Sequence, residues 1–383
     1  MKKSKVDKNI IFLGLVSFLT DISSEMIFSV FSVFFTVILG ASTILLGLVE
    51  GLADFSASSL NYVSGYLSDK YGKRKPFTIM GYGFSVLAKF FLVIVNSVWL
   101  ASAFRVFERL GKSFRGPPRD AWISSFTTSA NRGLSFGVHK ALDKAGAIVG
   151  PLIAFFIIRS LGESYSTFKL LFLIALVPAA ASVLVLFLLK DRSVKPTKRE
   201  NTFLMFKGTS KEYKNYLLSS AVFSLAYFSF SFLLLKAYLV GFMIKDVILL
   251  YLFFNLVFVI VSVPIGKLGD IIGRRKIIIL SFLIYLLMSI GFIFARYKWE
   301  VIVLFGLFGI FFAIDEAQSK AYILDLEKKR KATALGMYAY VTGMVYLPAS
   351  IIAGLLWKIN PAYAFMFASL ATLIGLGLFF RKK

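Results

Sequence analysis

Acidic and basic side chains recur inside apolar stretches of this chain, at spacings that give them a shared helix face. Asp21 and Glu25 are four residues apart in one such stretch, and Glu50 and Asp54 are four apart in the next. A charge at the centre of a bilayer costs about 2.5–3.5 kcal/mol, so such side chains must pair or face water. The residues that we select for a substrate or proton pathway are Asp21, Glu25, Asp54, Arg105, Glu108, His139, Asp143, Lys236, Asp315 and Glu316.

The composition is that of a membrane protein. Of the 383 residues, 58% are hydrophobic and 17% are charged, whereas soluble domains are about 45–50% apolar and about 25% charged. The mean hydropathy is +0.79. Apolar runs of about 17–25 residues, long enough to cross a bilayer, recur along the chain. We predict an all-α membrane protein with twelve transmembrane helices, at about 10–40, 43–67, 76–97, 98–113, 136–160, 166–190, 216–241, 245–268, 275–297, 300–323, 332–357 and 361–380.

The net charge of +24 orients the chain and does not indicate a nucleic-acid partner. Lys and Arg gather in alternate loops, at the N-terminal tail, 70–75, 112–132, 190–214, 267–276, 328–331 and the C-terminal end. This positive-inside pattern predicts that both termini are cytoplasmic. The apolar run after MKKSKVDK is too long for a signal peptide and lacks a small-residue cleavage site, so we expect a retained first helix.

The residue types also argue against cofactor chemistry. The chain has no cysteine and one histidine, which leaves no disulfide or thiolate metal site and speaks against a metal enzyme. The Gly-Lys pairs lack the spacing of a phosphate-binding loop. We therefore expect no cofactor, no ATP and no enzyme activity.

An internal repeat divides the chain into two similar halves. The stretch GYLSDKYGKRK (65–75) reappears as GKLGDIIGRRK (266–276), 201 positions later. The most polar stretch, 190–214, lies between the halves. We predict two six-helix bundles, 1–190 and 216–383, joined by a cytoplasmic linker at 191–215. Parallel repeats of this kind build secondary transporters, with the substrate path at the midplane between them.

The doubled loop resembles the signature of the major facilitator superfamily. More narrowly, DISSEMIF (21–28), RLGKSFRGPPRDA (109–121) and RGLSFGVHKALDKAGAIVGP (132–151) resemble an uncharacterised prokaryotic permease subfamily related to drug exporters. The resemblance implies that helices 1, 4, 7 and 10 line a cavity. It also implies that the two loops latch the halves together on the cytoplasmic side. The latch residues are Gly65, Asp69, Gly72, Arg74, Gly266, Asp270, Gly273 and Arg275.

The latch has a physical basis in its residue types. Glycines at 65 and 266 would let helix ends approach closely. Asp69 and Asp270 could interact with a basic side chain or with the positive N-terminus of a neighbouring helix. The alternative is that both loops are short basic turns that only set topology.

The fifth predicted helix carries titratable residues and glycines on one face, and we predict a bend in it. His139, Asp143, Gly146 and Gly150 share one face, and Gly146, Gly150 and Pro151 match the Gly-x-x-x-Gly-Pro core that accompanies proton-coupled export in the superfamily. The glycines permit tight packing, and the proline loosens the helix. Asp143 and His139 either anchor an inner gate or carry protons. Alternatively, the polar start is only the cytoplasmic end of the helix.

The fourth predicted helix combines a motif arginine with a proline pair. Arg105 matches the superfamily's helix 4 arginine, which is implicated in proton coupling, and Glu108 is close enough in sequence to pair with it. The prolines of RGPPRD (115–120) are expected to end this helix in a rigid turn; a gating salt bridge of Arg119 or Asp120 is the alternative. Glu50 and Lys112 lie near predicted span ends, where they could snorkel to the interface.

These observations predict a monomeric, multi-pass transporter of the cell membrane that works by alternating access. Its leading activity is proton-coupled efflux of a small amphipathic or drug-like compound, so its partners would be that substrate, protons and the bilayer. The alternative within transport is uptake or facilitated passage of an organic anion or polar metabolite, bound by Arg105, Lys236 and Lys320. A non-transporting membrane sensor or scaffold is the alternative of another class.

Overall fold

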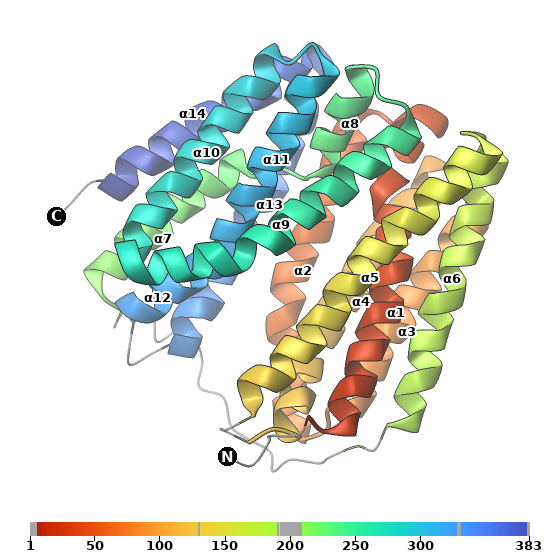
Figure 1. Cartoon of the computed structure of the whole chain (residues 1–383), viewed down its shortest axis with the longest axis vertical. Helices are drawn as coiled ribbons and strands as arrows, with labels where there is room; N and C mark the ends of the chain where they lie inside the picture. The colour runs from red at the N-terminus through yellow and green to blue at the C-terminus, as the bar shows by residue number, and fades with distance from the viewer. Residues whose placement is uncertain (1–5, 129–130, 190, 192–208, 328–330, 381–383) are drawn as a thin grey trace. The chain divides into compact units, whose positions relative to one another are not determined.

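The computed structural model describes residues 6–128, 131–189, 191, 209–327 and 331–380, and all regular structure in them is helical (Figure 1). In the first half of the chain the helices are α1 (Lys8–Val33) with the π-helical turn η1 (Phe34–Ile38), α2 (Thr43–Tyr71), α3 (Lys75–Val93), α4 (Val98–Ser125), α5 (Arg132–Leu161) and α6 (Tyr165–Leu188). In the second half they are α7 (Lys211–Ala226), α8 (Ser231–Leu239), α9 (Ile244–Ile272), α10 (Arg274–Phe294), α11 (Lys298–Ile314) with the π-helical turn η3 (Asp315–Ser319), α12 (Lys320–Leu326), α13 (Lys331–Ile359) and α14 (Pro361–Phe380).

Ten helices in the described residues are long and apolar enough to cross a membrane. The helix α4 is not among them, because charged residues such as Arg105 and Glu108 interrupt its apolar sequence. The helix α11 is not among them either, since its regular part has 17 residues before η3 begins. The predicted class, an all-helical membrane protein, is confirmed, whereas the count of twelve spans stays a prediction.

The proline pair does not end α4, so that prediction was wrong. The helix continues through Pro117 and Pro118 to Ser125. A proline at 117 cannot donate to the carbonyl of Ser113, four residues earlier. The Ser64 hydroxyl from α2 donates to that carbonyl at 3.2 Å instead. A neighbouring helix thus satisfies the freed group, which is how membrane helices tolerate proline.

In the second half of the chain, two spans that we predicted as continuous helices are interrupted. The predicted span 216–241 is divided, because α7 ends at Ala226 and α8 begins at Ser231. The predicted span 300–323 contains the π-helical turn η3, which begins at Asp315. Short π-helical turns inside α-helices frequently mark functional sites.

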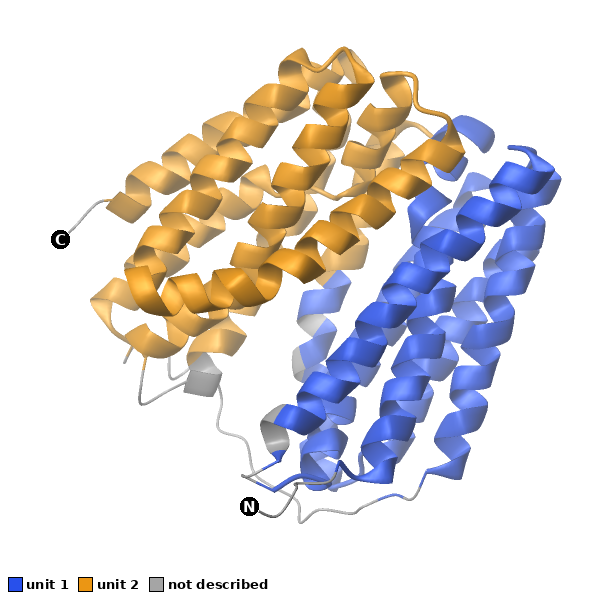
Figure 2. Ribbon diagram, in the orientation of Figure 1, with its two compact units in different colours: residues 1–40, 56–200 blue, residues 41–55, 201–383 orange. Residues whose placement is uncertain are grey.

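The chain separates into two compact units, and the division lies within α2 (Figure 2). Unit 1 comprises residues 1–40 and 56–200, and unit 2 comprises 41–55 and 201–383. Most of the expected linker 191–215 lies outside the described residues.

In unit 1, α1 packs along both α5 and α6, and α3 packs along α4. In unit 2, α7 packs along α14, and α9 packs along α11. The first part of α2 belongs to unit 2 because glycines bring it onto α13: a Cβ at Gly354 would lie 2.5 Å from the Thr43 carbonyl oxygen. The Thr43 hydroxyl also donates to the Gly354 carbonyl at 3.2 Å.

Candidate substrate and proton pathway

The glycine stripe of α5 packs against the acidic part of α1. A Cβ at Gly146 would lie 3.0 Å from the Cβ of Asp21, and one at Gly150 would lie 2.5 Å from the Ile22 carbonyl oxygen and 3.2 Å from the Cβ of Glu25. Only a residue without a side chain allows the backbones to approach this closely. The structure therefore brings together four selected residues, Asp21, Glu25, Gly146 and Gly150. The helix α5 runs on through Pro151, and a bend there stays a prediction.

A buried chain of polar groups connects α1, α3 and α4 inside unit 1. The Lys89 ammonium donates to the Ser24 hydroxyl at 3.0 Å, and that hydroxyl donates to the Glu108 carboxylate at 3.1 Å. Glu108 lies 3.7 Å from Arg105, which is the pairing that the sequence suggested. Lys89, Arg105 and Glu108 are 0%, 3% and 4% exposed. Opposite charges thus compensate each other where water is excluded.

Aromatic rings complete the surroundings of Arg105. Its guanidinium carbon lies 4.7 Å from the centroid of the Phe28 ring, close enough for a cation–π interaction. Lys89 was not among the selected residues. Its signal in the sequence was a lysine inside the otherwise apolar segment 76–97.

A second polar cluster forms around the hydroxyl of Ser17 on α1. Nε2 of His139 lies 3.0 Å from this oxygen, and the Tyr82 hydroxyl lies 3.2 Å from it. Arg119 donates to the same oxygen at 3.2 Å, and its guanidinium forms an ion pair with Asp120 at 3.1 Å. Arg119 is therefore a helical residue that faces His139, whereas the sequence had placed it in a turn.

His139 and Asp143 have different partners although they share a stripe of α5. His139 is buried against Ser17. The Asp143 carboxylate instead pairs with Lys140 at 3.0 Å, and the Lys140 side chain is largely exposed. The two residues thus have different hydrogen-bond partners, although they interact electrostatically with each other and both with Arg119.

The doubled loop holds an ion pair in each unit. In unit 1 the Asp69 carboxylate lies 2.6 Å from Arg74, and Arg74 also donates to the Ser68 hydroxyl at 2.6 Å. In unit 2 Asp270 pairs with Arg274 at 3.0 Å, and Arg274 also pairs with Asp325 at 2.8 Å. The partner of Asp270 is therefore not Arg275, the residue that the sequence repeat aligns with Arg74.

The shift of one residue follows from the helix boundaries. The helix α3 begins at Lys75, three residues after Gly72 (φ +64°), but α10 begins at Arg274, directly after Gly273 (φ +94°). Arg275 instead donates to the Phe379 carbonyl near the end of α14 at 3.2 Å. Lys75 does the same for the Phe187 carbonyl near the end of α6, at 3.0 Å. Cations at helix C-termini are stabilising.

The expected close approach at Gly266 was wrong. A Cβ there would meet no atom within 4 Å among the described residues. The close contact lies one turn further on, where a Cβ at Gly269 would overlap the Gln318 side chain. The Gln318 amide donates to the Ile265 carbonyl at 3.1 Å, so this polar side chain, which the sequence reading passed over, holds η3 against α9. Gly65 is buried.

In unit 2, Asp315 lies in an aromatic setting. It interacts electrostatically with four tyrosines, at positions 216, 227, 338 and 346. The Tyr227 and Tyr346 ring centroids are 5.5 Å apart, and Asp54 interacts with both of these residues. We call Asp54, Asp315 and these four tyrosines the tyrosine cluster. The Ser319 hydroxyl donates to Asp315 at 2.9 Å across η3.

Glu316 does not join this cluster. It pairs with Lys320, and both side chains are at least half exposed. The two neighbouring acids that the sequence grouped thus have different hydrogen-bond partners, although Glu316 and Lys320 both interact electrostatically with Asp315. The π-helical geometry of η3 is the local feature that the sequence pattern did not predict.

Glu50 is the residue that the sequence reading misjudged most. Its place near a predicted span end allowed it to snorkel to the interface, but it is fully buried. Its carboxylate accepts hydrogen bonds from Ser229 at 2.9 Å and Ser231 at 3.1 Å, at the break between α7 and α8. A buried carboxylate with two hydroxyl donors holds the interrupted segment against α2.

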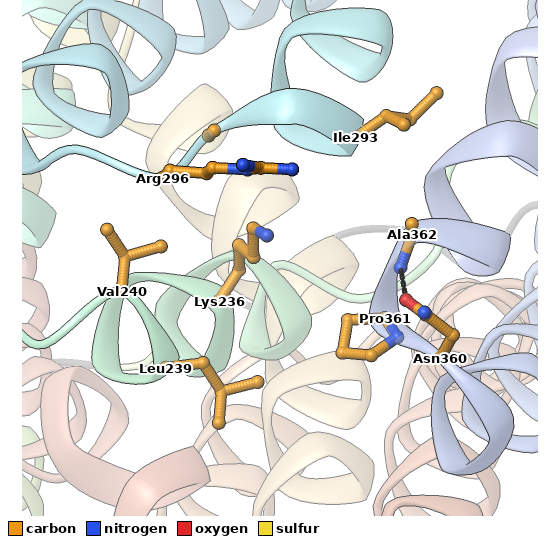
Figure 3. Close-up of a pocket in the computed structure, with 9 residues that line it drawn as sticks. Lys236, Leu239, Val240, Ile293, Arg296, Asn360, Pro361 and Ala362 are labelled. Atoms are coloured by element: carbon orange, nitrogen blue, oxygen red, sulfur yellow. Dashed lines mark hydrogen bonds between the residues drawn. The ribbon is translucent and has the colours of Figure 1, made fainter.

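Lys236 does not share a site with the selected acids of unit 2. It lines a cavity of about 360 Å³ together with Arg296 and Asn360 (Figure 3). Neither Asp54, Asp315 nor Glu316 lines this cavity.

Comparison with known proteins places the whole chain among membrane transporters. The family model described as Major Facilitator Superfamily matches residues 13–248 and 218–383. An uncharacterized MFS-type transporter of Methanocaldococcus jannaschii is 37% identical over 98% of this chain and 95% of its own length. Multidrug resistance protein 2 of Bacillus subtilis is 25% identical over 99% of this chain and 96% of its own length.

Solved structures agree at the level of the fold. The crystal structure of the nucleoside transporter NupG superposes with a TM-score of 0.78, covering 98% of this chain and all of that one. The sequence identity is 14%, so this likeness shows the fold alone.

Proposed function

The chain belongs to the Major Facilitator Superfamily and is a transporter rather than an enzyme, and we propose that it exports a small amphipathic or drug-like compound in exchange for protons. In this proposal the protein lies in the cell membrane. It has twelve transmembrane spans, and both termini are cytoplasmic. It works as a monomer by alternating access between the bundles 1–190 and 216–383.

The observation that carries the proposal is the contact between the glycines of α5 and the acids of α1. Asp21 and Glu25 lie on the face of α1 that contacts Gly146 and Gly150, so no side chain of α5 separates the two backbones there. Adding or removing a proton there changes the charge at a tight helix contact. A proton that binds one conformation better than the other shifts the balance between them, which is the requirement for coupling.

The tyrosine cluster supports an amphipathic substrate. Tyr227, Tyr338, Tyr346, Asp54 and Asp315 are partly exposed, whereas the rings behind them, such as Phe311, are buried. Tyrosine rings attract cations through their negative faces, and a nearby carboxylate adds to that attraction. We therefore expect cationic amphipathic compounds to bind better than neutral ones of the same shape.

Transport of an organic anion is the second candidate, and the ion pairs weigh against it. Of the three cations that it needs, Arg105 pairs with Glu108, and Lys320 pairs with Glu316. Lys236 alone lies in a cavity without a paired acid in its lining.

Flux measurements on reconstituted protein test the proposal. We expect proteoliposomes to accumulate an amphipathic cation when an outward proton gradient is imposed. Asp21→Asn or Glu25→Gln should abolish the response to pH while the protein stays folded. Glu163→Gln, an exposed change between α5 and α6, is the matched control. Gradient-driven flux that is unchanged in both α1 variants would overturn proton coupling there, and no flux of any compound would favour a sensor or scaffold.

A further inference from the structure

The cavity around Lys236 has the composition of a binding site for an anion with an apolar part. Its basic lining residues are Lys236 from α8 and Arg296 from the loop before α11. In Figure 3 the two basic side chains extend toward the same space. The remaining wall is formed by Leu239, Val240, Ile293, Ala295, Asn360, Pro361 and Ala362.

The charges at this cavity are not balanced by its lining. In the described part of the chain, the half-buried Lys236 ammonium has no hydrogen-bond or ion-pair partner. Glu300 interacts electrostatically with Arg296, but its carboxylate accepts from the backbone N–H groups of Arg296 and Tyr297 at 2.8 and 2.9 Å. Glu300 does not line the cavity.

A helix N-terminus adds to the positive character. The helix α14 begins at Pro361, and its first residues face the cavity. The Asn360 side chain caps it by accepting from the Ala362 N–H at 2.9 Å. The positive end of a 20-residue helix thus meets the same space as Lys236 and Arg296.

The cavity lies at the end of unit 2 opposite the Gly273 loop. The helix α10 begins directly after Gly273 and ends at Phe294, next to the cavity. Tyr297 and Trp299 beside it are both 64% exposed. Exposed tyrosine and tryptophan at helix ends mark the headgroup region of a bilayer. A ligand here would meet lipid headgroups on one side and water on the other.

We propose that this cavity binds the phosphate group of an anionic amphiphile or solute. Lys236 and Arg296 would hold the phosphate oxygens with the N-terminus of α14, and Leu239 and Ile293 would contact apolar parts of the ligand. A lipid phosphodiester and a free phosphate share this chemistry. The site is independent of proton coupling by Asp21 and Glu25, so either assignment can fail without the other.

Two probes distinguish the sources of the phosphate. The full-length protein is placed in nanodiscs of phosphatidylcholine, with or without phosphatidylglycerol, and its thermal unfolding is measured with and without inorganic phosphate. A lipid ligand predicts stabilisation by phosphatidylglycerol, and a soluble ligand predicts stabilisation by phosphate in phosphatidylcholine alone. Either kind of stabilisation supports the site, provided that substitutions of the cavity residues reduce it.

Substitutions establish that dependence. We expect Lys236→Gln and Arg296→Gln each to weaken binding of the stabilising probe about fivefold, the usual contribution of one basic residue to an anionic headgroup. Lys358→Gln removes an exposed charge near the start of α14 that does not line the cavity, so it controls for general attraction between the basic protein and anionic lipid.

The proposal is overturned if neither probe stabilises the wild type, or if the two cavity variants respond as Lys358→Gln does. Lys236→Arg, which keeps the charge, should retain the response. Phosphorus counted in the purified protein gives a readout that does not depend on stability. If Lys236→Gln does not fold, equal phosphorus in wild type and Arg296→Gln contradicts the site.

Discussion

The interiors of the two units differ in the side chains that they bury. Unit 1 buries full charges, with Lys89, Arg105 and Glu108 all less than 5% exposed. Unit 2 buries the carboxylate of Glu50, which accepts from two serine hydroxyls. It otherwise packs rings together, such as Phe223 on Phe282 with centroids 4.1 Å apart and Tyr285 against Phe311 with centroids 4.7 Å apart. Buried charge is costly and is retained where it does work, whereas aromatic surface is apolar and adaptable. In the function proposed above, this difference corresponds to a division of labour in which unit 1 handles protons and unit 2 handles the substrate.

The largest effect should come from breaking the buried charges of unit 1. Glu108→Gln leaves Lys89 and Arg105 without their shared carboxylate, and breaking a buried pair typically costs about 3–5 kcal/mol. In unit 2, Tyr285→Phe removes only a neutral hydrogen bond, 2.6 Å long, to the Ala226 carbonyl, and should cost about 0.5–1.5 kcal/mol. Unfolding in mixed detergent measures both. Equal losses would remove the contrast between the interiors.

Filling the contact between α1 and α5 should come next. Gly150→Ala places a Cβ 2.5 Å from the Ile22 carbonyl oxygen, and overpacking of this kind costs about 1–3 kcal/mol. Gly137→Ala on the same helix is the matched control, because a Cβ there meets no described atom within 4 Å. We expect Gly150→Ala to lose stability and transport together and Gly137→Ala to keep both. A fully active Gly150→Ala protein would argue that the tight contact is dispensable.

A smaller effect is expected for the aromatic side of the comparison. Tyr346→Leu keeps apolar volume but removes a ring of the tyrosine cluster, and a cation–π contact is worth about 0.5–2 kcal/mol. Binding of a cationic compound should weaken about 2- to 30-fold, with less change for a neutral analogue. Tyr363→Leu, at the start of α14, serves as control. If both compounds weaken equally, the cluster contributes shape rather than cation recognition.

The smallest effect is expected at Asp270 in the repeated loop of unit 2, and the two loops should differ. The Asp69–Arg74 pair is mostly buried, whereas Asp270 is 68% exposed in its pair with Arg274. Exposed ion pairs contribute about 0–1 kcal/mol to stability. Asp270→Asn should therefore change the stability little, and Asp69→Asn should lower it measurably. Single cysteines introduced in this cysteine-free chain report opening of the cytoplasmic side by their labelling rates. Identical rates in both variants and wild type would count against a latch.

Much of the fold could be predicted, because long apolar runs and the repeated loop can be recognised within short stretches of sequence. The end of α4 could not, since the prolines alone do not reveal that Ser64, 49 residues earlier than Ser113, satisfies the freed carbonyl. The shift from Arg275 to Arg274 likewise depends on where α10 begins.

The candidate site was predictable in its residue types but not in its partners. Helix phase placed Asp21 and Glu25 on one face, and the glycine motif indicated tight packing on α5. Which charges meet depends on the rotation of neighbouring helices, so the Lys89–Ser24–Glu108 chain had no sequence signature beyond a lysine in an apolar run. Glu50 was misjudged for the same reason, because its serine donors lie in a helix break that the apolar pattern hides.

Proton release on substrate binding tests the division of labour most directly. The purified protein is mixed with an amphipathic cation in weakly buffered detergent solution, and released protons are followed with a pH-sensitive dye alongside binding. The wild-type protein should bind the cation and release protons as it does so. The double variant Asp21→Asn with Glu25→Gln should bind without release, and Asp315→Asn should lose binding and release together. Undiminished proton release by the double variant would contradict the account.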